Sequence, residues 1–124
     1  MLAGASRTYF SLDAFQGRKM AFADNLKQLA SVERIEKLEL LTQDGAVLAT
    51  LENKPGQAGS VAVYHHLFAR HGAIHETAAR EGLTLYAEHT EDAKLFPGKH
   101  PNIDRLLRIV EEKDSLQVRV HRKK

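Results

Sequence analysis

The chain has 124 residues, 43% of them hydrophobic and 27% charged, which is the composition of a single globular domain. It contains no cysteine, which excludes disulfides, thiolate nucleophiles and cysteine-ligated metals, and which agrees with a cytoplasmic location. No apolar run approaches the roughly 20 residues of a membrane-spanning helix, so we expect no membrane contact. The net charge is only +2 and aromatic residues are few, so nucleic-acid binding is not expected.

Residues 1–19 differ in composition from the residues that follow. They contain three basic residues against one acid, Asp13, and they lack the apolar central stretch of a secretory signal. We interpret them as an N-terminal extension, either an artefact of the start site or an arm that packs on the body or on a partner. We expect a single domain over residues 20–121, followed by a basic tail over residues 122–124.

The first predicted elements of the domain are a helix and a β-hairpin. Phe22, Leu26 and Leu29 recur at helical spacing and predict a short amphipathic helix. Apolar and polar residues alternate over residues 34–42, and a second apolar run covers residues 46–51. Asp44-Gly45 lies between these two runs. Because both residues tolerate the positive φ of a tight turn, this dipeptide is a strong hairpin signal.

Three helices are predicted after the hairpin. The first covers residues 60–71, with Ser60 as N-cap and Gly72 at the left-handed C-terminal cap. The second covers residues 74–96, with a break at Gly82 as the alternative to a continuous helix, and it ends before Pro97-Gly98. The third begins at 100–102, within a further candidate segment over residues 99–105, where Pro101 suits the first turn and Asp104 and Arg105 are expected to form a surface pair. Its single apolar stripe is formed by Ile103, Leu106, Leu107 and Val110.

The chain ends with a predicted strand over residues 116–121. Leu116, Val118 and Val120 alternate with polar residues, which is typical of a strand with one buried face. The natural place for this strand is beside the hairpin. We therefore predict an α+β fold in the order α-β-β-α-α-α-β, with a small antiparallel sheet packed against three to four helices.

The first candidate site consists of Tyr86, His89 and Asp92. Six of the seven histidines lie between residues 65 and 100, and His89 falls in the middle of an otherwise apolar helical stripe. The other residues of the stripe are Ala78, Gly82, Leu85, Tyr86, Ala93 and Phe96. A spacing of three residues places the phenol, imidazole and carboxylate within reach of one another. A site is therefore expected on this helix face.

Two functions of this site are open, besides a structural one. Asp92 orients His89 as a general base with Tyr86 as proton donor, or His89 and Asp92 ligate a divalent metal. The third ligand then comes from His71, His75 or His100. His100 reaches the site because the short link before it folds two helices back on each other. The structural alternative is that His89 is a core histidine with both ring nitrogens hydrogen-bonded.

The second candidate is the turn-rich joint before the helix at residue 60. Glycines Gly56 and Gly59 let the backbone approach an anion, amides at the helix start point toward it, and Lys54 adds positive charge. Ser60 completes the joint. The pattern lacks the Lys-Ser/Thr pair of a P-loop, so phosphate or carboxylate binding is weighed against a simple turn.

Five segments together resemble a small bacterial protein family described as a domain of unknown function. They are residues 35–41, residues 52–56 with Gly59-Ser60, residues 78–83, residues 86–93 and residues 97–106. The resemblance covers about residues 20–110, which leaves the N-terminal extension outside it. It implies no reaction, cofactor or catalytic residue.

The sequence thus supports two hypotheses. The first is a small soluble ligand-binding protein or enzyme of the hydrolase type, which acts by general acid–base chemistry or metal-assisted hydrolysis on a small anionic substrate. The alternative is an interaction protein without chemistry, in which strand edges pair into a homo-oligomer and His89 is structural.

Overall fold

The computed structural model describes residues 20–124, and the prediction for residues 1–19 lies outside this part of the chain. The predicted α+β class is confirmed. The elements in chain order are α2 (Phe22–Lys27), β1 (Ile35–Leu41), β2 (Val47–Glu52), α3 (Ala58–His71), α4 (Glu76–Tyr86), α5 (Glu88–Leu95), α6 (Pro101–Glu112) and β3 (Gln117–Arg122). Across residues 20–124, none of these helices has the length and apolar character needed to cross a bilayer.

The sheet is antiparallel, and β1 is its central strand between β2 and β3. The predicted hairpin is present, because the N–H of Thr42 donates to the carbonyl of Ala46 at 2.9 Å and Gly45 adopts φ 90°. β3 lies beside β1, as expected. It runs one residue further than predicted, and the N–H of Lys123 still donates to the carbonyl of Arg34 at 2.9 Å.

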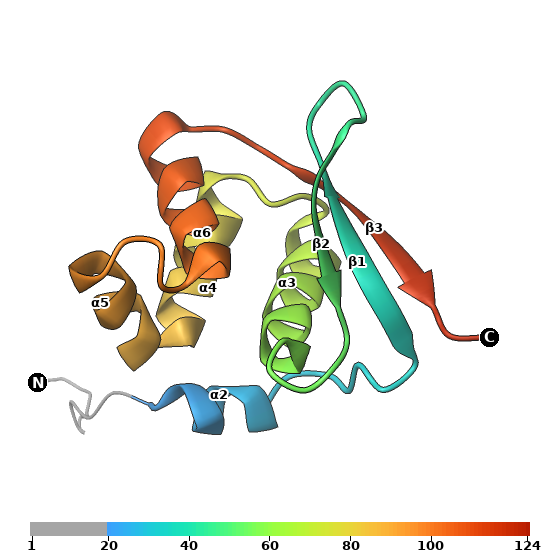
Figure 1. Ribbon diagram of the computed structural model, residues 1–124, viewed down its shortest axis with the longest axis horizontal. Coiled ribbons are helices and arrows are strands. Elements are labelled where there is room, and N and C mark those ends of the chain that lie inside the picture. Colours follow the sequence, from blue (N-terminus) through green and yellow to red (C-terminus); the bar gives the residue numbers. More distant parts are fainter. Residues whose placement is uncertain (1–19) are drawn as a thin grey trace, which may run out of the picture.

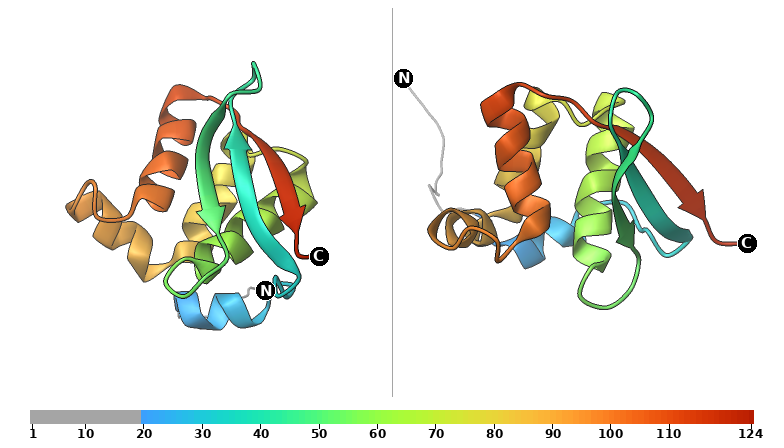
Figure 2. Two further views of the ribbon diagram at one scale, coloured as in Figure 1. Left: turned by 45° about the vertical axis from the view of Figure 1, so that its right-hand side comes forward. Right: turned by 45° about the horizontal axis from the view of Figure 1, so that its top comes forward.

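The helices lie on one face of the sheet. Figure 1 and the two further views in Figure 2 show α3 between the sheet on one side and α4 and α6 on the other, with α5 at the far end and α2 across the base. The opposite face of the sheet is polar. There the Glu39 carboxylate accepts from Arg119 at 3.0 Å and from His121 at 2.7 Å. The packed core therefore lies entirely on the helical side.

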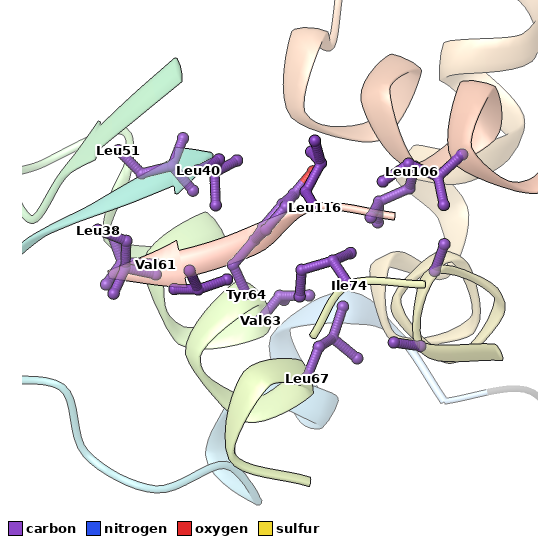
Figure 3. Close-up of a cluster of buried hydrophobic side chains, with 14 of the residues drawn as sticks. Leu38, Leu40, Leu51, Val61, Val63, Tyr64, Leu67, Ile74, Leu106 and Leu116 are labelled. Carbon is purple, nitrogen blue, oxygen red and sulfur yellow. The ribbon is translucent and has the colours of Figure 1, made fainter. Parts of the chain in front are cut away.

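The core joins the sheet to the helices through fully or nearly fully buried apolar side chains (Figure 3). Leu38, Leu40, Leu51, Val61, Val63, Tyr64, Leu67, Ile74, Leu106 and Leu116 are among them. Ile74 and Leu116 also exchange backbone hydrogen bonds of 2.8 and 3.1 Å. This bridge ties the start of α4 to the start of β3, so the helical half cannot shift along the sheet.

The helix predicted over residues 74–96 is divided at Ala87, and not at Gly82. Gly82 lies inside α4, where a methyl group would lie 2.8 Å from the side chains of both Leu67 and Leu106. The glycine therefore allows the helices to pack closely and does not end α4. The chain turns instead at Ala87, with φ 53°, and the Thr90 hydroxyl donates back to the carbonyl of Leu83 at 2.6 Å. The predicted apolar stripe therefore ends early, and Phe96 is exposed.

Candidate functional site

A pocket of about 430 Å³ lies where α2, the loop before α3, the α4–α5 junction and the start of α6 meet. It brings together six residues predicted from the sequence, namely Gly56, Gly59, Ser60, Tyr86, His89 and His100. Phe22, Lys99 and Asn102 also line it. The two separate candidate regions of the sequence therefore form one site.

Tyr86 and Ser60 meet at this pocket. The Tyr86 hydroxyl donates to Ser60 Oγ at 2.6 Å, and burial raises the pKa of Tyr86 well above its usual value of 10.0. Tyr86 therefore keeps its proton and donates it to Ser60 Oγ, which leaves the Ser60 hydroxyl hydrogen free to be donated elsewhere. Ser60 is not the N-cap as expected, since α3 begins at Ala58 and its N-cap Gln57 makes no side-chain hydrogen bond.

The carboxylate–imidazole pair of the site is Asp92 with His100, where the sequence predicted Asp92 with His89. His100 Nε2 lies 2.7 Å from Asp92 Oδ2, and Lys99 Nζ lies 2.8 Å from the same oxygen. Hydrogen bonds from Lys99 and then His100 lower the pKa of Asp92 below 3.8. Because an ionised carboxylate can only accept, His100 Nε2 carries the proton, which leaves Nδ1 as the acceptor nitrogen of the neutral ring.

His89 differs from both predictions made for it. Its side chain is 42% exposed, so it is not a sealed core histidine, and its nearest carboxylate oxygen belongs to Glu88, 4.0 Å from Nε2. The ring packs edge-on against Phe22, with centroids 5.1 Å apart, and lies 5.7 Å from the ring of His100. His89 is therefore the second imidazole of the pocket and is not paired with Asp92.

The predicted metal ligands His89, Asp92 and His100 do not form a ligand set in this arrangement. Within residues 20–124, no three His, Asp or Glu side chains are grouped so as to hold a metal ion. Asp92 already accepts from His100 and Lys99, while the carboxylate oxygen beside His89 Nε2 belongs to Glu88, 4.0 Å away.

Lys54 lies outside the pocket, contrary to the sequence prediction. Its ammonium group is 3.8 Å from Glu52, and its side chain is 56% exposed. The turn at Gly56, with φ 91°, directs the chain into α3 while Lys54 remains at the surface. Lys99 is the lysine that lines the site. Sequence reasoning noted the segment 99–105 but did not assign this lysine to the anion contact.

A buried polar network supports the pocket from beneath, and sequence reasoning missed it. The Tyr64 hydroxyl donates to the carbonyl of Asn102 at 2.6 Å and accepts from Arg105 at 3.1 Å. Burial raises the pKa of Tyr64 to about 12. Arg105, expected to form a surface pair with Asp104, makes no ion pair within the described residues, while Asp104 accepts from the N–H of Gly98 at 2.9 Å.

The electrostatic character of the pocket follows from these side chains. Lys99, His89 and His100 contribute cationic or donor groups, and the Ser60 hydroxyl is a further donor. The first turns of α3 and α6 also line it, and neither N-cap residue makes a side-chain capping bond. Helix starts carry partial positive charge, which adds to that of these donors.

A second histidine cluster lies between α3 and α4. The Glu81 carboxylate accepts from His66 at 2.9 Å, from His71 at 2.7 Å and from Arg70 at 3.1 Å. α3 ends at His71 with Gly72 at φ 80°, so His71 and His75 do not share a helix, as the sequence indicated. None of these cluster residues lines the pocket. Sequence reasoning did not identify the cluster.

These features define a class: a small α+β domain with a histidine-lined pocket at the junction of four segments. The family model of DUF2322, described as an uncharacterized protein conserved in bacteria, matches residues 22–120, and the chain belongs to this family. The resemblance inferred from the sequence is thereby confirmed. No curated protein and no solved structure matches the chain.

Proposed function

We propose that this pocket binds a small anionic molecule and that His100 acts on it as a general acid–base catalyst oriented by Asp92. The observation that carries the proposal is the 2.7 Å contact between His100 Nε2 and Asp92, because the imidazole ring of His100 also lines the pocket. The carboxylate holds the proton on Nε2, so Nδ1 is the nitrogen that exchanges a proton with a substrate or water. Imidazole suits this role because it titrates near neutral pH.

The preference for an anion rests on the charges at the pocket. Lys99 is the permanent cation, and a second proton on His100 would add another positive charge beside it. When both groups carry a proton, the single negative charge of Asp92 offsets only one of the two positive charges, because the carboxylate faces both groups through the same oxygen. A phosphate or carboxylate group restores the balance by hydrogen bonds to Lys99 and to the Ser60 hydroxyl.

A hydrolytic reaction would use these groups in a defined order. His100 Nδ1 removes a proton from a water molecule as the water oxygen attacks the substrate, and the same proton then passes to the leaving oxygen as its bond breaks. Asp92 stabilises the imidazolium that exists between the two steps. Metal-assisted hydrolysis, the other route predicted, would need a ligand group that the side chains of residues 20–124 do not offer ready-made.

An NMR titration of the full chain with inorganic phosphate tests the proposal. We expect the ring signals of His89 and His100 to shift with a dissociation constant in the millimolar range. Lys99→Gln should weaken binding by about fivefold, because one charge near the ligand contributes about 1 kcal/mol in water. Lys113→Gln is the matched control, since Lys113 lies at the end of α6 away from the pocket and pairs with Glu76. Unchanged histidine signals would reject the proposal.

A specific observation favours the second candidate, an interaction protein without chemistry. β2 is an edge strand of the sheet and exposes Val47 and Leu48, which are 49% and 53% accessible. Such an edge can pair with the same edge of a second copy. Light scattering on the full chain should then give a dimer mass that Leu48→Lys reduces to the monomer mass. A monomer mass for the unsubstituted chain at all concentrations would reject this candidate.

A further inference from the structure

We infer that the ligand of this pocket is amphipathic, with an anionic group joined to a compact and preferably aromatic body, and that α2 is the element that selects for it. This inference rests on the proposed function and narrows its substrate class. It follows from how the apolar and polar side chains are distributed around the pocket, and from how Phe22 is held there.

The pocket has an apolar wall and a polar wall. Phe22, Leu26, Pro101 and Ile103 contribute the apolar side chains, whereas Ser60, His89, Lys99 and His100 contribute the donors. A volume of about 430 Å³ far exceeds a single phosphate group and is at the lower end of pockets that hold small organic molecules. A bare inorganic anion would therefore leave the apolar wall in contact with water.

Phe22 is fixed at the apolar wall by several contacts. Its ring stacks on Tyr86 at 5.2 Å and 22°, and it meets His89 edge-on at 5.1 Å. Its backbone N–H donates to the Glu88 carboxylate at 2.9 Å, which anchors α2 to the start of α5. A ligand ring that enters the pocket would add to this aromatic group in the offset or edge geometry that aromatic pairs prefer.

The two walls are close enough for one small molecule to touch both. A methyl group added at Gly59 would lie 3.3 Å from Phe22 and 3.4 Å from Leu26, so α2 packs directly on the first turn of α3. Ser60, the adjacent residue, carries the donor hydroxyl. The glycine thus lets the apolar wall approach the polar one, and α2 contributes to both the shape and the polarity of the site.

Isothermal titration calorimetry on the full chain tests the inference with phenyl phosphate, methyl phosphate and inorganic phosphate. We expect phenyl phosphate to bind about tenfold tighter than methyl phosphate, since the ring buries apolar surface on the α2 wall. Phe22→Ala should remove most of this ratio and leave methyl phosphate binding unchanged. Leu26→Ala should reduce the ratio as a second variant, and Leu95→Ala, at an exposed leucine of α5 outside the pocket, should leave it intact. The binding of benzoate and of acetate is compared in the same way, with a carboxylate in place of the phosphate group.

The outcomes separate the inference from the proposed function. Equal binding of phenyl and methyl phosphate, and of benzoate and acetate, overturns the inference and leaves anion binding in place. A preference for the phenyl group that survives in both α2 variants, with the fold intact by circular dichroism, also overturns it. Absence of binding for all five probes overturns the proposed function as well.

Discussion

Two carboxylates of this chain each accept hydrogen bonds from histidine and from a lysine or arginine side chain, yet their surroundings differ. Glu81 accepts from His66, His71 and Arg70, which all lie on another helix, α3. Asp92 accepts from Lys99 and His100, which lie only seven and eight residues further along the chain. The first cluster therefore ties two helices together, whereas the second fixes a loop beside a pocket.

The difference shows that a histidine–carboxylate pair alone does not define a site. At Glu81 the hydrogen bonds join protein groups to each other, and the cluster lies outside the pocket. At Asp92 the paired imidazole lines a pocket that also contains a hydroxyl and a lysine. All three imidazoles bond their carboxylate through Nε2, so the cavity beside His100 is what distinguishes a candidate catalytic group from a structural one.

The largest expected effect concerns the support beneath the pocket. Tyr64→Phe removes the hydroxyl that bonds both Asn102 and Arg105 in a fully buried place, so we expect the free energy of unfolding to fall by about 1–3 kcal/mol. Urea unfolding of the wild type and the variant measures this change in the free energy of unfolding. Tyr86→Phe is the control and should cost less, since Ser60 Oγ lies at the partly accessible pocket. An unchanged stability in Tyr64→Phe would show that the network is not structural.

The next effect tests the structural role of the Glu81 cluster. Glu81→Gln should lower the free energy of unfolding by about 1 kcal/mol, because three charge-assisted contacts to α3 are weakened at a partly exposed position. Phosphate binding at the pocket should not change. Glu111→Gln, at an exposed glutamate with no ion pair within residues 20–124, is the matched control. A loss of phosphate binding in Glu81→Gln would contradict the division between the two clusters.

The stabilisation from Glu81 should also depend on pH. Burial disfavours its charged form, but hydrogen bonds from His71 and then His66 outweigh this, so the pKa of Glu81 lies below 4.5 in the folded protein. A lowered folded pKa stabilises the fold above the unfolded pKa, and this contribution is lost as the pH falls through the folded value. The stability difference between the wild type and Glu81→Gln should therefore be full at neutral pH and shrink below pH 4.5.

The smallest effect on stability is expected at Asp92. Asp92→Asn leaves an amide oxygen that still accepts from His100, and both partners are local in the chain, so thermal unfolding should shift little. Because the amide of this variant can also donate its N–H to His100 Nε2, whereas the carboxylate can only accept, the His100 ring should populate both neutral tautomers, which NMR of its ring nitrogens can detect. Phosphate should bind at least as tightly, because a negative charge beside the pocket has been removed. A single fixed tautomer in this variant would show that Asp92 does not orient the ring.

Most of the fold could be predicted because local signals agreed with it. Asp44-Gly45 predicted the hairpin, Gly72 predicted the end of α3, and Pro101 predicted the start of α6. The division of α4 from α5 could not be predicted. Gly82 carries the expected breaking signal but is retained for close helix packing, and Ala87, where the chain turns, carries none.

The site could be located from the sequence but its internal pairing could not. Tyr86 and His89 both line the pocket, although the helix whose spacing predicted them is divided between them at Ala87, and the glycine-rich joint supplied Ser60. Spacing could not show that Asp92 prefers His100, because that contact depends on how the loop after α5 folds back. Arg105 was similarly misplaced, since its direction is set by Tyr64, which lies 41 residues away in the chain.

The turn at Ala87 has a consequence for how this family can vary. With φ 53° and ψ −119°, this residue occupies a conformation that costs a residue with a side chain on the order of 1–3 kcal/mol. Glycine would relieve that strain, whereas valine, isoleucine or threonine would increase it sharply at this position. Family members should therefore carry only the smallest residues here, and a β-branched residue at position 87 would mark a relative in which the second imidazole has left the pocket.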